Sequence, residues 1–123
     1  MSARAVSIYQ RVDQETASPT RLLDQLYARL LRDIDDAAAR IAANDAGAKG
    51  AAISHAIAIL SELVSGLDFS ADAQLCGGLK GLYDFVTDRL TDANMRFDAR
   101  PLADARRIVV VLRQSFEDAA RAQ

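Results

Sequence analysis

The side chains that most often carry out chemistry in proteins are scarce in this chain. It has one histidine, His55, one cysteine, Cys76, and the glutamates Glu15, Glu62 and Glu117. A di-iron centre in a helical bundle uses a Glu from each of two helices and a Glu-x-x-His motif from each of the other two. A structural zinc site is usually closed by four Cys or His ligands. Neither set can be assembled here, so the sequence predicts no metal site and no cofactor.

Nucleophilic catalysis has no better basis in the sequence. A nucleophile such as Cys76 needs a neighbouring base, and nothing places His55 beside it. No glycine-rich loop has the spacing of a Walker or dinucleotide-binding motif. Asp84, Asp88 and Asp92 recur at every fourth position, which is typical of the solvated face of a helix. We therefore predict that the protein is not an enzyme.

The composition indicates one helical domain of 123 residues, half of them apolar, with only six glycines and two prolines. A net charge of −2 argues against a nucleic-acid binder, which would usually carry a basic face. No apolar run approaches the roughly 20 residues that span a bilayer, so we predict no membrane insertion. The single cysteine excludes an internal disulfide and suits a reducing compartment. We therefore expect a cytoplasmic protein.

Apolar residues recur at three- and four-residue spacing along most of the chain, which predicts four helices. Ser18 can cap the first helix through its side-chain oxygen, and Pro19 fits the first helical position. Gly47 can adopt a left-handed conformation after that helix, and Ser70 can cap the third. The predicted helices cover residues 19–43, 51–65 and 72–94, and the last begins at Pro101.

Four helices joined by three short links favour antiparallel neighbours. The predicted fold is therefore all-α, an up-down four-helix bundle formed by residues 18–123. Residues 1–17 form a separate N-terminal arm with a short amphipathic pattern that includes Ile8, Tyr9 and Val12. This pattern can be helical, but a helix of that length is marginal in water on its own. The arm is therefore expected either to dock on the bundle or to stay mobile.

The last predicted helix carries more apolar surface than a bundle core requires. Its run Ile108-Val109-Val110-Val111-Leu112 is apolar around more than half of the helix, so two of the five side chains cannot face the core. The arm or a second copy of the chain can cover this surface. Alternatively, it can form a groove for an amphipathic segment of a partner. The sequence leaves these alternatives open.

The third predicted helix contains Gly77, Gly78 and Gly81. Each glycine inside a helix costs about 0.5–1 kcal/mol relative to alanine. One interpretation is a late or frayed start of this helix. The other is that a neighbouring backbone, from this chain or from a partner, packs closely against the glycines.

The chain resembles the FliS family over about residues 8–116. The matching motifs, in chain order, are Ile8-Tyr9-Gln10 with Val12; Ala17-Ser18-Pro19 with Leu22 and Leu26-Tyr27; Ala56, Ile59-Leu60 and Leu63 with Leu67-Asp68; Leu79, Leu82-Tyr83-Asp84-Phe85, Leu90 and Ala93-Asn94; and Leu112-Arg113 with Phe116. The chain departs from the family pattern at Ala28-Arg29, where an acidic residue and a glycine are usual, and at Phe116, where tryptophan is common. The shared order and spacing of the motifs carry the resemblance.

The resemblance implies a cytoplasmic chaperone of flagellin export that is built as an antiparallel helical bundle. Such proteins bind the C-terminal disordered region of flagellin, prevent its premature polymerisation and aid its delivery to the flagellar type III export gate. A disordered client can wrap around a large surface and fill apolar grooves with short amphipathic segments. The alternative is a homodimeric helical adaptor or scaffold with a different protein client, in which a weak homodimer uses the same apolar surface.

We predict that the second helix, the third helix and the surplus apolar face of the fourth helix form the client-binding grooves. We expect the N-terminal arm to cover one groove until the client displaces it. The predicted client-binding residues are Ile8, Tyr9, Val12, Leu22, Leu26, Tyr27, Ile57, Leu60, Leu79, Leu82, Tyr83, Val86, Leu90, Val110 and Leu112.

Overall fold

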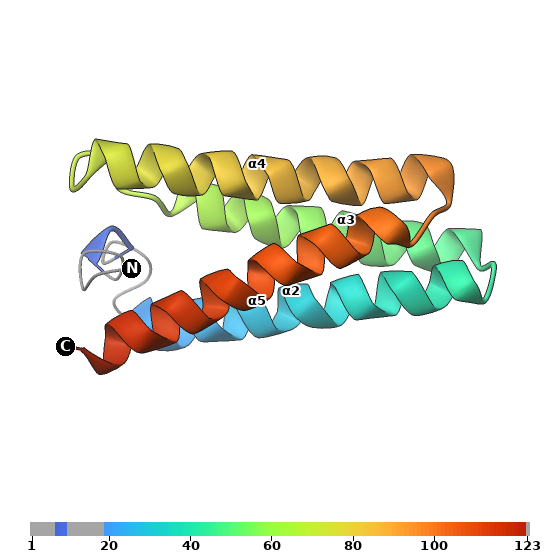
Figure 1. Cartoon of the computed structure of the whole chain (residues 1–123), viewed down its shortest axis with the longest axis horizontal. Coiled ribbons are helices and arrows are strands. Elements are labelled where there is room, and N and C mark those ends of the chain that lie inside the picture. The colour runs from blue at the N-terminus through green and yellow to red at the C-terminus, as the bar shows by residue number, and fades with distance from the viewer. Residues whose placement is uncertain (1–6, 10–18, 123) are drawn as a thin grey trace.

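The computed structural model describes residues 7–9 and 19–122, and in these residues four long helices make up the protein. Each helix runs opposite to the one before it, so the chain goes up and down along the long axis of the molecule (Figure 1). Helix α2 packs against α3 and α5, and α4 packs against the same two helices. The prediction of an all-α antiparallel bundle is confirmed. The helices are α2 (Pro19–Ala42), α3 (Ala46–Ser65), α4 (Ala73–Arg96) and α5 (Arg100–Arg121).

The link between α2 and α3 is shorter than the sequence suggested. Asn44 takes the left-handed conformation with φ 58°, and the Asp45 carboxylate accepts a hydrogen bond from the Ala48 amide at 3.1 Å. This cap starts α3 at Ala46 rather than near residue 51. The prediction that Gly47 would be left-handed is therefore wrong, because Asn44 fills that role and Gly47 lies within the helix.

The start of α4 also differs from the sequence-based expectation. Asp72 is the N-cap, and its carboxylate accepts a hydrogen bond from the Leu75 amide at 3.1 Å. The predicted cap, Ser70, instead donates its hydroxyl and its amide to the Asp68 carboxylate, in the turn before the helix. The prediction for Ser70 is wrong because α4 begins at Ala73, and Asp72, directly before it, supplies the oxygen that accepts from the helix amide.

A buried lysine joins the start of α3 to the end of α4. Lys49, near the start of α3, is only 8% exposed. Its ammonium donates to the Asn94 carbonyl at 3.1 Å and lies 4.6 Å from the centre of the Phe97 ring. Phe97 ends α4 in a left-handed conformation, with φ 54°. The charge thus sits where the unpaired carbonyls of a helix C-terminus favour a cation.

The three glycines of α4 lie in regular helix and on its exposed side. The interpretation of a late or frayed helix start is therefore wrong. A Cβ atom added to Gly77, Gly78 or Gly81 would meet nothing within 4 Å, so no other part of the described chain packs closely against them. Close packing by a partner stays a prediction.

The core lies along the axis between the four helices and consists mainly of Leu, Ile, Val and Ala with a group of aromatic rings at one end. Among the described helices, none combines enough length with enough hydrophobicity to cross a bilayer.

Candidate functional site

The described part of the N-terminal arm, residues 7–9, docks at the end of the bundle where α3 gives way to α4 and where α5 ends (Figure 1). Ile8 is 0% exposed and Tyr9 is 1% exposed. The amide of Asp68, in the α3–α4 link, donates to the Ile8 carbonyl at 2.9 Å. The Tyr9 ring meets the Phe116 ring of α5 edge-on, with centroids 5.7 Å apart. Of the two expectations for the arm, docking is therefore correct for these residues.

Tyr9 joins two tyrosines of the bundle in a chain of hydrogen bonds. Its hydroxyl lies 2.8 Å from the Leu63 carbonyl and 3.0 Å from the Tyr83 hydroxyl, which in turn lies 2.5 Å from that of Tyr27. A carbonyl can only accept, and a hydroxyl has one hydrogen, so Tyr9 donates to Leu63. Tyr83 is then left to donate to Tyr9, and Tyr27 to donate to Tyr83. Each hydroxyl hydrogen is used once.

Burial makes this cluster neutral. Removal from water is the largest cause that raises the pKa of Tyr9, Tyr27 and Tyr83 above the ordinary value of a phenol. The three hydroxyls therefore stay protonated at physiological pH. They act as hydrogen-bonding groups and not as acids or bases.

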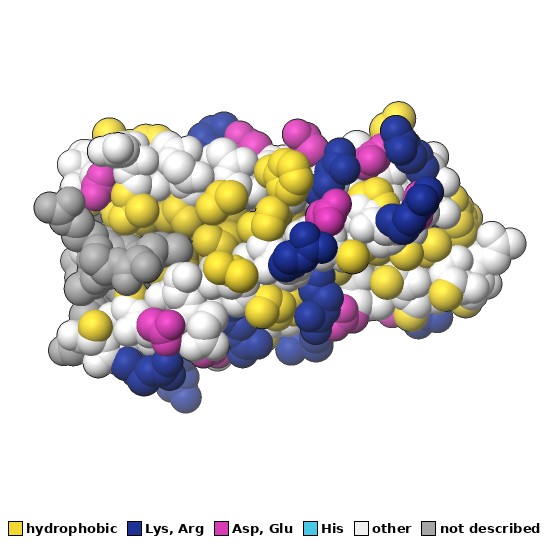
Figure 2. All heavy atoms as spheres, in the orientation of Figure 1, with side chains coloured by type: hydrophobic (Ala, Val, Ile, Leu, Met, Phe, Trp, Pro, Cys, Tyr) yellow, Lys and Arg dark blue, Asp and Glu magenta, His cyan; other side chains and the backbone are white. Residues whose placement is uncertain are grey.

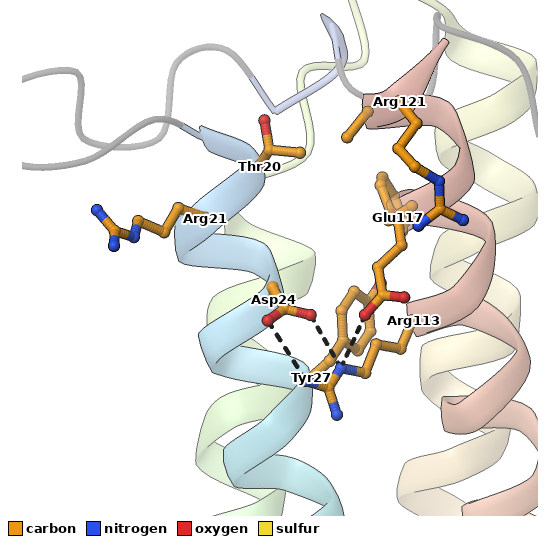
Figure 3. A pocket seen from close by; sticks show the side chains of 9 residues that line it. Thr20, Arg21, Asp24, Tyr27, Arg113, Glu117 and Arg121 are labelled. Carbon is orange, nitrogen blue, oxygen red and sulfur yellow. Dashed lines mark hydrogen bonds and ion pairs between the residues drawn. The ribbon is translucent and has the colours of Figure 1, made fainter.

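Beside this cluster, the start of α2 and the end of α5 enclose a pocket of about 460 Å³ (Figure 3). Tyr27 and Phe116 contribute aromatic surface to it. The Arg113 guanidinium lies 2.9 Å from an Asp24 oxygen through Nε and 3.5 Å from Glu117. The hydrogen bond from Arg113 is the largest cause that lowers the pKa of Asp24. The arginine thus has both carboxylates as partners, and it joins α2 to α5 at the rim of the pocket.

Several large apolar side chains of α4 and α5 face solvent. Leu82 and Phe85 on α4 are 40% and 44% exposed, and Val110 and Val111 on α5 are 41% and 59% exposed. Figure 2 shows one face of the molecule, on which hydrophobic side chains gather and charged ones border them. Val110 and Val111 are the two members of the apolar run 108–112 that do not face the core, as the helical spacing predicted. We refer to Leu82, Phe85, Val110 and Val111 as the exposed apolar residues of α4 and α5.

The structure places most of the predicted client-binding residues inside the bundle. It brings Ile8, Tyr9, Tyr27 and Tyr83 together at one end, whereas Val12 lies outside the described residues. Leu22 and Ile57 are half-buried, and Leu82 and Val110 are exposed. The buried members are Ile8, Tyr9, Leu26, Tyr27, Leu60, Leu79, Tyr83, Val86, Leu90 and Leu112. Whether these residues contact a client stays a prediction.

Four groups of this region were not among the predicted residues. Phe85 and Phe116 stand in motifs that carry the family resemblance, so a signal for them existed in the sequence. The Leu63 carbonyl and the Asp68 amide left no signal, because every residue type carries these backbone groups. Among the described residues there is no group of three or more His, Cys, Asp or Glu side chains that could hold a metal ion.

Comparison with known proteins gives a consistent result. The model of the family described as flagellar protein FliS matches residues 1–123. The chain is 32% identical over 108 residues to the flagellar secretion chaperone FliS of Salmonella typhimurium, covering 84% of this chain and 80% of the relative. It is 27% identical over 118 residues to the flagellar secretion chaperone FliSB of Pseudomonas aeruginosa, covering 93% and 94%. The chain therefore belongs to the FliS family of flagellar secretion chaperones and is not an enzyme.

Proposed function

We propose that this chaperone acts in the cytoplasm, binds the C-terminal disordered region of flagellin, prevents its premature polymerisation and aids its delivery to the flagellar type III export apparatus. Membership of the family supports a client in flagellar export. The single observation that carries the proposal further is the docked segment Ile8–Tyr9. A short piece of chain already fills a site that contacts α3, α4 and α5, and a client segment of similar character can fill it in turn.

The contacts of this segment allow a client segment to replace it. Ile8 and Tyr9 are buried, so their removal exposes apolar surface unless another segment replaces them. An incoming client therefore gains about as much apolar contact as the arm gives up. The exposed apolar residues of α4 and α5 add surface on which a longer disordered client can continue, with the cost of ordering it keeping the affinity moderate.

A calorimetric titration tests the proposal. The full chain is titrated with a peptide covering the C-terminal disordered region of the flagellin from the same organism. We expect one-to-one binding with a large negative heat-capacity change, because apolar burial has that signature. Absence of binding at about 100 µM peptide, a concentration that would reveal even a weak complex, would contradict it.

Substitutions on the surface locate the binding. Leu82→Asp and Val111→Asp place a charge among the exposed apolar residues, and each should weaken peptide binding about tenfold through the desolvation of that charge. Met95→Asp is the matched control. Met95 is an apolar residue of α4 that is 80% exposed, and it lies at the C-terminal end of the helix, away from Leu82. Equal effects of all three would argue against a surface on this side.

The same surface could instead join two copies of the chain, as in the alternative of a homodimeric adaptor. The exposure of Val111 and Phe85 is the observation that favours this candidate. Sedimentation equilibrium over a hundredfold range of concentration distinguishes the two. A monomer mass at every concentration eliminates the homodimer.

A further inference from the structure

The site filled by Ile8 and Tyr9 presents three polar backbone or hydroxyl groups to its occupant. The Leu63 carbonyl accepts from the Tyr9 hydroxyl at 2.8 Å. The Tyr83 hydroxyl lies 3.0 Å from the hydroxyl oxygen of Tyr9. The Asp68 amide donates to the Ile8 carbonyl at 2.9 Å. The walls of the site are therefore apolar, but its occupant must also form hydrogen bonds with these three groups.

The Leu63 carbonyl depends on this occupant because it lies in the last turn of α3. The amide that would reach it in a continuing helix belongs to Leu67, which bonds to Val64 instead, at 3.1 Å. The hydroxyl of Tyr9 takes the place of that amide. An occupant without a donor would leave the carbonyl buried and unpaired.

The tyrosines of the bundle cannot compensate for a missing occupant. With Tyr9 gone, the hydroxyls of Tyr27 and Tyr83 have two hydrogens and one bond between them. If Tyr27 donates to Tyr83, the Tyr83 hydrogen has no acceptor among residues 19–122, and if Tyr83 donates, the Tyr27 hydrogen has none there. Either way, one hydroxyl hydrogen and the Leu63 carbonyl lose their partners within the described part of the chain.

We propose that the Ile8–Tyr9 site selects client segments in which an aliphatic residue stands beside a large neutral side chain that donates and accepts at once, as a phenol or a carboxamide does. The inference rests on the proposed function. Such a side chain donates to Leu63 and accepts from Tyr83 at the same time. A carboxylate has no donor for Leu63, an ammonium has no acceptor for Tyr83, and an apolar side chain has neither. The aliphatic neighbour takes the place of Ile8.

The test measures the affinity of the full chain for the C-terminal flagellin peptide and for a set of its variants. In each variant one Tyr is changed to Phe, one Asn to Leu or one Gln to Met. One of these changes should weaken binding about tenfold, because it leaves a buried pair unsatisfied. Against the Tyr83→Phe protein the same change should cost at least about threefold less, since one of its two partners is already absent.

Two further variants make the test independent of how well Tyr83→Phe folds. Tyr9→Phe removes the hydroxyl of the arm but keeps its ring, so the arm competes less well and the unmodified peptide should bind about tenfold more tightly. Thr87→Val is the matched control. It removes an α4 hydroxyl that bonds to the Tyr83 carbonyl at 3.0 Å, outside the site, and it should leave the affinity unchanged.

The outcomes separate the two proposals. If the peptide binds but no polar change matters and Tyr9→Phe has no effect, the inference on selectivity is wrong and the proposed function stands. If the peptide does not bind, the proposed function and the inference fail together. One sensitive polar residue that is coupled to Tyr83 supports both.

Discussion

The hydroxyl of Tyr9 donates to the carbonyl of Leu63 across 2.8 Å, and this bond fixes a residue of the N-terminal arm to the last turn of α3. The two residues are 54 positions apart in the chain. Their contact makes residues 7–9 of the arm part of the bundle end, because the same hydroxyl also reaches Tyr83 of α4. These residues are thus held by specific polar contacts as well as by apolar burial.

Tyr9→Phe should lower the free energy of unfolding by about 1–3 kcal/mol. The ring and its contact with Phe116 stay, whereas the Leu63 carbonyl loses its donor. Urea denaturation followed by circular dichroism measures the change. A loss below about 0.5 kcal/mol, the usual range for a surface substitution, would show that water replaces the hydroxyl at no cost.

Lys49→Met should lower the free energy of unfolding by about 1.5–3 kcal/mol, the range of hydrogen bonds to charged groups. It removes the buried bond to the Asn94 carbonyl and the contact with the Phe97 ring. Lys80→Met is the control, because Lys80 is exposed and, among the described residues, pairs with Asp84 one turn away. Equal losses in the two variants would contradict the role of Lys49 in closing the end of α4.

Alanine at Gly77, Gly78 or Gly81 should raise the stability by about 0.5–1 kcal/mol for each position. The three positions lie inside α4 with nothing within 4 Å of the added methyl group. Thermal unfolding measures the gain. If the variants are more stable but bind the flagellin peptide less well, a partner backbone approaches this face closely.

Stability should fall as the pH rises above about 10, the ordinary pKa of a phenol in the unfolded chain. Burial raises the pKa of Tyr9, Tyr27 and Tyr83 in the folded protein, so the unfolded state loses protons first. The stabilisation is present below that pH and is lost progressively above it. Denaturant midpoints measured at about pH 9 and pH 11 should differ, and the difference should be smaller in Tyr9→Phe.

The helices could be predicted from the sequence because the apolar spacing and Pro19 act locally. The ends of the helices could be predicted less well, since several nearby residues can serve as each cap. Asp45 and Asp72 cap α3 and α4, whereas the sequence favoured Gly47 as a terminator and Ser70 as a cap. Propensities do not decide between neighbouring candidates such as Ser70 and Asp72, because serine and aspartate favour the cap position about equally.

Only the side chains of the candidate site could be predicted from the sequence, and their hydrogen-bond partners could not. Tyr9, Tyr27 and Tyr83 were all named from the sequence, but their convergence depends on three helices and the arm meeting at one end. Burial of Tyr27 and Tyr83 follows from helical spacing, whereas the partners of their hydroxyls do not. The decisive Leu63 carbonyl is set by how α3 ends, which is a property of the folded backbone.

The tyrosine cluster has one more consequence, for optical spectroscopy. The chain contains three tyrosines and no tryptophan, and all three tyrosines belong to the cluster. Tyrosine fluorescence and the tyrosine bands of the near-ultraviolet dichroism of the unlabelled protein therefore report on this one end of the bundle. The proposed displacement of the arm can therefore be tested in real time without attaching a dye, provided that the added peptide itself lacks tyrosine and tryptophan.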